Sequence, residues 1–332
     1  GWLIINKNIG ISSAKVVNKI KQIMDIKKAG HAGTLDPLAS GVLPVAIGEA
    51  TKTIKYAMIS EKSYEFEISW GIETETDDLE GEILRKSKIR PSKKEIINAL
   101  PNFVGKIMQK PSRYSAIKIA GVRSYKLARN SIAVNIPKRE IFIKSFNLLE
   151  EIDENKSRFI VECGKGVYIR SLARDLAIYL NTYGHISYLK RLSVGKFLYK
   201  DAILLADLAN LVDKATISEV IRPISFVLDD IPAIDINSDE ALLISRGQRI
   251  YKEDMKLLEG KLYKEVYITS KGKPIALAKI EDKYIFPFRV FNNLLMENFD
   301  VDNNREKKRS NKKICYRKRR YGCLLYTSDA AD

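Results

Sequence analysis

A single stretch, residues 30–52, constrains this chain more than any other, because it sets a carboxylate on a loop directly ahead of a buried strand. It reads GHAGTLDPLASGVLPVAIGEATK, and Asp36 is the acid in its first half. Pro37 disfavours the helical conformation for the residue before it, so we expect Asp36 on a turn or an extended segment. The predicted strand is too apolar to face water, with Leu43, Val45 and Ile47 at alternate positions. A carboxylate on a loop backed by a rigid strand suits chemistry, although Asp-Pro also occurs in ordinary turns.

The excess of basic residues indicates a polyanionic partner, most simply nucleic acid. The formal net charge is +16 and the pI is about 9.5. Residues 305–321 alone hold ten Lys or Arg residues and one acid. No apolar run approaches the roughly 20 residues of a membrane span, and the first residues lack the features of a signal peptide. Because the three cysteines are scattered, as in a reducing compartment, we expect a cytoplasmic protein without a membrane segment.

Neither a metal nor a nucleotide cofactor is indicated. The cysteines and histidines form no CxxC or HExxH spacing, and no Gly-rich loop has the spacing of a P-loop or of a dinucleotide-binding turn. The acid-rich segment 71–81 also lacks the spacing of an EF-hand calcium loop.

Three further segments carry patterns of apolar residues. Residues 2–6 predict a short strand, and the apolar residues between Val16 and Met24 predict a helix that ends near Lys27. The segment 64–70 alternates strictly, so that Tyr64 shares one strand face with Phe66, Ile68 and Trp70. On this pattern alone Tyr64 is a core or interface aromatic residue.

A second apolar stripe predicts another helix, which carries an arginine in its first turn. Its apolar stripe comprises Ile169, Leu172, Ala173, Leu176 and Leu180, and Arg170 lies in the first turn, off that stripe. A cation at a helix N-terminus opposes the helix dipole. Arg170 therefore either faces solvent or pairs with a carboxylate. Upstream, residues 109–125 interleave Tyr with Arg and Lys, which suits RNA binding but also an ordinary basic surface.

These segments together resemble the tRNA pseudouridine synthase B family over about residues 2–200. The family's Gly-His-x-Gly-Thr-Leu-Asp-Pro-Leu-Ala stands at 30–39, its Gly-x-x-Thr-x-Thr-x-Asp-x-x-Gly at 71–81, and its third motif at 163–170. A match over about twenty positions is far more specific than a short motif. Ser112 and Lys190 depart from the pattern, where Pro and Arg are more usual. The resemblance implies an α+β fold, with a mixed, mostly antiparallel sheet flanked by helices and a small C-terminal β-rich domain.

The resemblance also implies an activity and its residues. The family isomerises the uridine at position 55 in the T-arm of tRNA to pseudouridine, after flipping the base out of its stack. The resemblance implies that Asp36 is the essential catalytic residue, that Arg170 contacts Asp36, and that the Tyr64 ring lies against the target base. The matching substrate-binding positions are His31, Tyr168, Leu189 and Lys52. No cofactor, metal or protein partner is implied, and we expect a monomer. Whether Asp36 attacks C1′ or C6, or removes the C2′ proton, stays open.

The expected domains are a catalytic domain over residues 1–228, a PUA-like RNA-binding domain over 233–291, and a basic, disordered tail over 292–332. A generic β-barrel is the alternative for the second domain. Two rival functions remain. One is a noncatalytic tRNA-binding protein or tRNA-folding chaperone, which would not need Asp36, Tyr64 and Arg170 together. The other is a related synthase directed by a guide RNA.

Overall fold

The computed structural model describes residues 1–115, 117–130, 132, 135–213, 216–252 and 265–292. Residues 1–230 form one compact unit, and a second unit begins at Ile231. The predicted tail, from residue 293 on, lies outside the described residues. In the part of the chain that is described, no helix has the length and apolar character needed to span a membrane.

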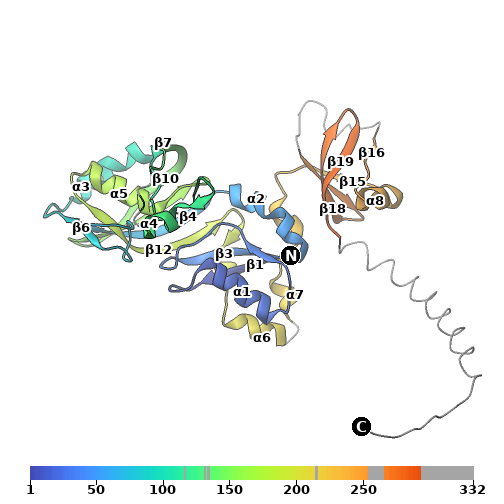
Figure 1. Ribbon diagram of the computed structural model, residues 1–332, viewed down its shortest axis with the longest axis horizontal. Helices are drawn as coiled ribbons and strands as arrows, with labels where there is room; N and C mark the ends of the chain where they lie inside the picture. Colours follow the sequence, from blue (N-terminus) through green and yellow to red (C-terminus); the bar gives the residue numbers. More distant parts are fainter. Residues whose placement is uncertain (116, 131, 133–134, 214–215, 253–264, 293–332) are drawn as a thin grey trace, which may run out of the picture. The chain divides into compact units, whose positions relative to one another are not determined.

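A mixed sheet of ten strands forms the centre of the first unit (Figure 1). Only the pairs β1–β14 and β3–β12 are parallel, and the other pairs are antiparallel. The predicted mixed, mostly antiparallel sheet is therefore confirmed. In order across the sheet its strands are β14 (Ile203–Leu204), β1 (Trp2–Lys7), β3 (Ser40–Ile47), β12 (Gly184–Val194), β4 (Lys62–Trp70), β11 (Lys156–Cys163), β10 (Arg139–Asp153) and β7 (Gly105–Gln109), with β2 (Ala29–His31) on β3 and β13 (Phe197–Leu198) on β12.

Helices flank this sheet, with α5 packed against β12 and α1 against β2 (Figure 1). The α-helices of the first unit are α1 (Ser13–Ile23), α2 (Ile54–Ile59), α3 (Lys93–Ala99), α4 (Ser124–Arg129), α5 (Ile169–Tyr179), α6 (Asp207–Asp213) and α7 (Ile217–Val220). Single 3-10 turns are η1 (Gly48–Thr53), η2 (Leu100–Phe103), η3 (Tyr199–Asp201) and η4 (Ile224–Val227). Two small hairpins pair β5 (Ile72–Thr74) with β6 (Ile83–Lys86) and β8 (Lys118–Ile119) with β9 (Val122–Arg123).

Both faces of β1 and β3 are buried, whereas β4 buries one face. Leu3 and Ile5 belong to the large core beneath α1, α3 and α5, while Trp2 and Ile4 point into a second core with Phe197. This explains why residues 2–6 are apolar without alternation. On β4 the alternate residues Tyr64, Phe66, Ile68 and Trp70 all join the large core.

Helix α1 begins where a serine caps it and ends earlier than the sequence indicated. The Ser12 hydroxyl accepts a hydrogen bond from the Lys15 amide at 3.3 Å. The helix ends at Ile23, and Asp25 adopts a φ of 47°. A residue in this left-handed region cannot continue an α-helix, so the predicted end near Lys27 was wrong.

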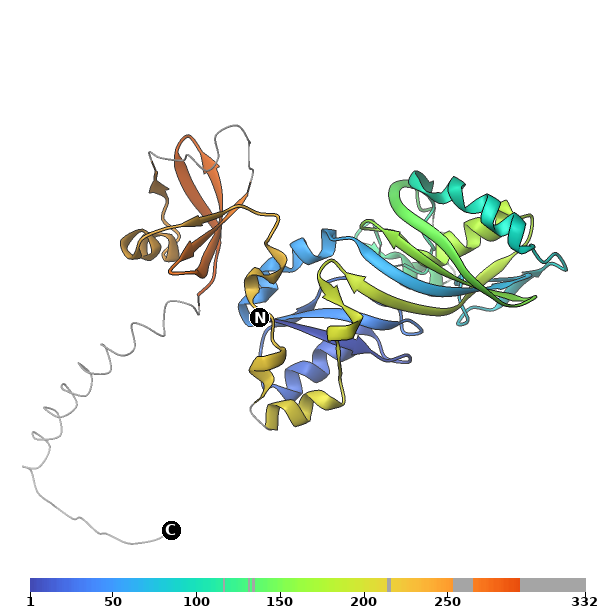
Figure 2. The same ribbon diagram turned by 180° about the vertical axis from the view of Figure 1, so that it is seen from behind.

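The second unit is a small β-rich domain, seen from two sides in Figures 1 and 2. Its core includes Ile234, Ile244 and Ile268. In order across its sheet the strands are β15 (Ala233–Asp235), β17 (Val266–Ser270), β18 (Lys273–Glu281), β19 (Tyr284–Val290) and β16 (Ile250–Tyr251), and α8 (Ser238–Ser245) packs against β18.

Candidate active site

Asp36 lies on the loop between β2 and β3, and the start of the chain clamps this loop on both sides of it. The buried Ser13 hydroxyl donates to the Leu35 carbonyl and accepts from the Leu35 amide, both at 2.9 Å. On the other side, the Pro37 carbonyl accepts from the Gly10 amide at 2.8 Å and from Lys7 Nζ at 3.2 Å. The β1–α1 turn thus fixes the backbone that carries Asp36.

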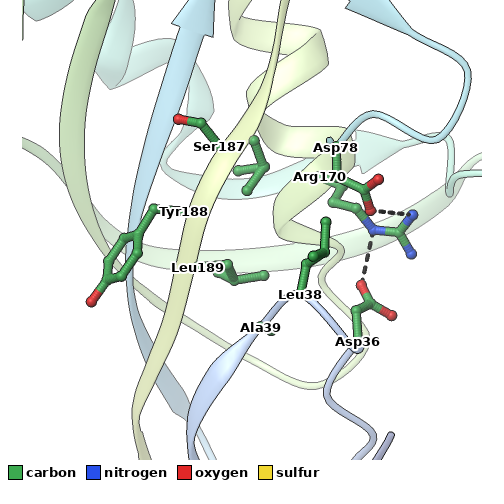
Figure 3. Close-up of a pocket in the computed structure, with 9 residues that line it drawn as sticks. Asp36, Leu38, Ala39, Asp78, Arg170, Ser187, Tyr188 and Leu189 are labelled. Atoms are coloured by element: carbon green, nitrogen blue, oxygen red, sulfur yellow. Dashed lines mark ion pairs between the residues drawn. The ribbon is translucent and has the colours of Figure 1, made fainter. Parts of the chain in front are cut away.

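Arg170 binds Asp36 and a second carboxylate at the same time (Figure 3). Its Nε lies 2.9 Å from Asp36 Oδ2, and its Nη1 lies 3.3 Å from Asp78 Oδ2. The Arg170 side chain is only 7% exposed, whereas the Asp36 side chain is 40% exposed. Of the two alternatives for Arg170, solvent exposure is wrong, and pairing with a carboxylate is what the structure shows.

The buried guanidinium is held by backbone carbonyls as well. Nη1 donates to the Thr76 carbonyl at 2.8 Å, and Nη2 donates to the Tyr114 carbonyl at 2.9 Å. A buried cation needs both charge partners and hydrogen bonds to offset its lost hydration. The two carboxylates and the two carbonyls supply these partners to Arg170. Through Arg170, Asp36 is linked to the acid-rich segment 71–81.

Asp78 is a site residue that the sequence analysis did not single out. It is 5% exposed, and it accepts hydrogen bonds from the Thr76 hydroxyl and from the Glu80 amide. A Cβ at Gly81 would come within 2.5 Å of the Thr76 amide nitrogen, so this turn closes only around glycine. The threonine, aspartate and glycine positions of that motif were the available signal.

Two hollows meet at Asp36 and Arg170. The smaller, of about 270 Å³, reaches to β12, and the wider groove, of about 2110 Å³, runs past α1 and the segment 71–81. Both are lined by Asp36, Asp78 and Arg170. Figure 3 shows Leu38 next to Asp36, with Leu189 on the far side of Leu38, while the Tyr188 ring points away from Asp36. The half-exposed carboxylate therefore faces a small apolar hollow and an open groove together.

Of the predicted substrate-binding residues, His31 and Leu189 lie at these hollows. His31 lines the groove at the end of β2, and its buried Nδ1 has no hydrogen-bond partner in the described part of the chain. Burial, and secondly the charge of Arg191, lower the pKa of His31. Leu189 lines the smaller hollow.

The structure places the other predicted residues around the site rather than at the two hollows. Tyr64 is 8% exposed in the large core, where burial raises the pKa of its phenol. Tyr168 caps α5, its backbone bonded twice by the Gln109 side chain, at 3.1 and 2.9 Å. Lys52 forms an ion pair with Glu49 in η1.

The arrangement is suited to nucleophilic or base chemistry. Arg170 contacts Asp36 through Oδ2, which leaves Oδ1 outside the ion pair. A carboxylate oriented in this way can attack an electrophilic carbon or accept a proton. In the described ranges no three His, Cys, Asp or Glu side chains gather as a metal site would require.

Comparison with known proteins agrees with the fold. A solved structure, of an H/ACA RNP bound to a substrate RNA containing 2′-deoxyuridine, superposes with a TM-score of 0.65 at 22% identity, covering 88% of this chain and 86% of that one. This likeness concerns the fold, a pseudouridine synthase sheet followed by a small β domain.

Sequence relatives identify the family. Residues 21–169 match the model of the TruB family pseudouridylate synthase N-terminal domain, and residues 170–229 match that of the tRNA pseudouridylate synthase B C-terminal domain. The tRNA pseudouridine synthase B of Bradyrhizobium diazoefficiens is 43% identical, covering 88% of this chain and 86% of its own length, and that of Rhodospirillum rubrum is 45% identical, covering 88% and 96%. The chain belongs to the TruB family of pseudouridylate synthases, and it is an isomerase that acts on tRNA. The resemblance seen in its motifs is thus confirmed.

Proposed function

We propose that Asp36 carries the isomerisation of the uridine at position 55, in the T-arm of tRNA, to pseudouridine. The observation that supports this role best is the Asp36 carboxylate itself, half exposed where the two hollows meet and oriented by the buried Arg170. In this proposal the flipped uracil enters the smaller hollow against Leu189, and the RNA strand follows the wider groove past His31.

The reaction exchanges one glycosidic bond for another. The N1–C1′ bond breaks, the uracil turns, and a C5–C1′ bond forms; C5 loses its proton and N1 gains one, so there is no net redox change. Asp36 attacks C1′ or C6, or it removes the C2′ proton, and each route requires an unprotonated carboxylate within reach of the nucleotide. Base flipping brings the nucleotide to the carboxylate. We propose that the Tyr64 ring then packs against the uracil.

The remaining parts have proposed roles in binding. We assign catalysis to residues 1–228 and RNA binding to a PUA-like domain over 233–291, with the basic tail over 292–332 adding affinity for phosphate groups. Tyr168 and Lys52 are further proposed RNA contacts at the edge of the site. One copy of the chain suffices, because the residues that we place at Asp36 all come from one chain, and its tRNA substrate implies a cytoplasmic location.

Carbodiimide treatment and primer extension of unmodified tRNA test the proposal. After incubation with the protein, a stop is expected at one position in the T-arm. Asp36→Asn should bind tRNA within about threefold of the unaltered protein and give no stop. Asp175→Asn is the matched control, since this carboxylate also pairs with an arginine, Arg174, but does not line either hollow at Asp36.

The possible outcomes separate the alternatives. A stop produced by Asp36→Asn would exclude Asp36 as the catalyst. Tight binding without a stop from any variant would favour a tRNA-folding chaperone, and a stop outside the T-arm would reject the assigned uridine.

A further inference from the structure

A second arginine, Arg191, lies deep beneath the Asp36 loop. It is on β12 and is 1% exposed. In the sheet it is paired with Gly41 of β3 on one side and with Tyr64 of β4 on the other. Cross-strand neighbours in a sheet point to the same face, so the Arg191 side chain shares a face with Tyr64.

The guanidinium of Arg191 joins the two ends of the loop that carries Asp36. Its Nε donates to the Val42 carbonyl at 2.7 Å, and its Nη2 donates to the Gly33 carbonyl at 3.0 Å. Gly33 precedes Asp36 and Val42 follows it, so the Arg191 side chain links the two ends of the loop. The backbones of β3 and β12 also lie in close contact here, because a Cβ at Gly41 would lie 2.2 Å from the Arg191 carbonyl oxygen.

The same guanidinium also acts on Tyr64. Arg191 pairs with Tyr64 across β12 and β4, and its charge lowers the pKa of the Tyr64 phenol, against the larger, raising effect of burial. Among the described residues, no Asp or Glu forms an ion pair with Arg191, in contrast to Arg170. Burying an arginine without a carboxylate is costly. Its donors go instead to the loop ends, and its side chain lies on the face of the sheet that carries Tyr64.

We propose that Arg191 is a positioning residue for the isomerisation, which sets the distance between Asp36 and the Tyr64 ring by holding both ends of the Asp36 loop against the strand face that carries Tyr64. This inference rests on the proposed function, in which Asp36 reacts and Tyr64 supports the base. Arginine is required because its planar fork can donate in several fixed directions, whereas lysine offers one compact charge.

Arg191→Lys separates this role from simple core stability. The variant keeps the buried charge and loses the fork, so we expect kcat to fall by about 10- to 100-fold, as for a small misplacement of reacting groups. The dissociation constant for tRNA should change by less than about threefold, because Arg191 does not line the groove. Arg158→Lys is the matched control: Arg158 pairs with Glu67 elsewhere on the sheet, and its kcat should be unchanged.

Histidine resonances report independently on the buried charge. The chain has two histidines, His31 and His185, so an NMR titration of labelled histidine is simple to assign with a His185→Gln variant. The charge of Arg191 contributes to the lowered pKa of His31. Arg191→Lys should leave that pKa unchanged, and Arg191→Met should raise it. A fall of kcat in Arg191→Lys with an unchanged His31 titration indicates lost geometry rather than lost charge or a collapsed core.

The proposal is overturned if folded Arg191→Lys keeps kcat within about twofold, or if kcat and tRNA affinity fall in parallel. Should that variant fail to fold by circular dichroism, Gly33→Ala disturbs the loop end that Arg191 holds, since Gly33 has a φ of +95°, which strains any side chain there. Folded Gly33→Ala with full kcat would likewise overturn it. Activity in Asp36→Asn would reject the proposed function itself, whereas inactive Asp36→Asn beside fully active Arg191→Lys would reject only the role of Arg191.

Discussion

Arg170 Nε lies 2.9 Å from Asp36 Oδ2, and the same guanidinium reaches Asp78 Oδ2 at 3.3 Å. The carboxylate at the two hollows is therefore oriented by a side chain that is itself anchored in the segment 71–81. A disturbance at Asp78 or at the Thr76 carbonyl should reach Asp36 through this one guanidinium.

Arg170→Lys should lower kcat by about 100-fold, because a lysine keeps the charge but cannot hold both carboxylates in fixed directions. Single-turnover rates at saturating protein measure this, and tRNA binding should stay within about threefold. Arg174→Lys serves as control, since Arg174 also lies on α5 and pairs with Asp77 and Asp175. Equal losses in both variants would indicate general damage to α5.

Ser13→Ala should loosen the Asp36 loop. It leaves the buried amide and carbonyl of Leu35 without their partner, which costs roughly 1–3 kcal/mol of unfolding free energy. We expect kcat to fall about tenfold. Ser12→Ala removes the cap of α1 and costs about 1 kcal/mol, yet kcat should not change. Urea unfolding and single-turnover kinetics of the two variants, compared side by side, would contradict the prediction if kcat followed stability alone.

Tyr64→Leu should cut kcat by about 100-fold, whereas Tyr64→Phe should lose less than about tenfold, if the ring serves mainly as a surface for the base. The phenylalanine variant keeps the ring and loses only the hydroxyl group. Both rates are measured under single-turnover conditions with tRNA. An equal loss in the two variants would assign the effect to the hydroxyl group.

The buried His31 should make stability depend on pH. Its folded pKa is lowered from the ordinary 6.5 by burial and by the charge of Arg191, so the unfolded chain binds a proton first as the pH falls. Stability is therefore lost on acidification below about 6.5. Urea unfolding at pH 7.5 and 5.5 should show a larger loss for the unaltered protein than for His31→Gln. The same loss in both would mean that His31 is not the group responsible.

The local sequence pattern was sufficient to predict strands and helices in which buried and exposed positions alternate regularly. The alternation of Tyr64, Phe66, Ile68 and Trp70 predicted β4, and the motif around Asp36 indicated both the loop and the family. The match of whole motifs, rather than any single residue, predicted the mixed sheet and the C-terminal β domain.

Periodicity by itself left open the contacts that join distant segments, and for Arg170 only the family motif implied its contact with Asp36. Arg170 lies off the apolar stripe of its helix, and only the approach of Asp36 and Asp78 makes its burial favourable. Asp78 was one acid among several in a polar loop; the motif marked its position, but the burial of Asp77 and Asp78 follows only from the fold.

The sequence by itself thus determined the family, the reactive carboxylate and the strands and helices that periodicity reveals, because these depend on residue type and near-neighbour spacing. The tertiary structure decided which charges are buried and what they hold: Arg170 against two carboxylates, and Arg191 against the carbonyls of Gly33 and Val42. A buried guanidinium is stable only where separate strands and loops bring acceptors to it, and that convergence is a property of the folded chain rather than of any segment.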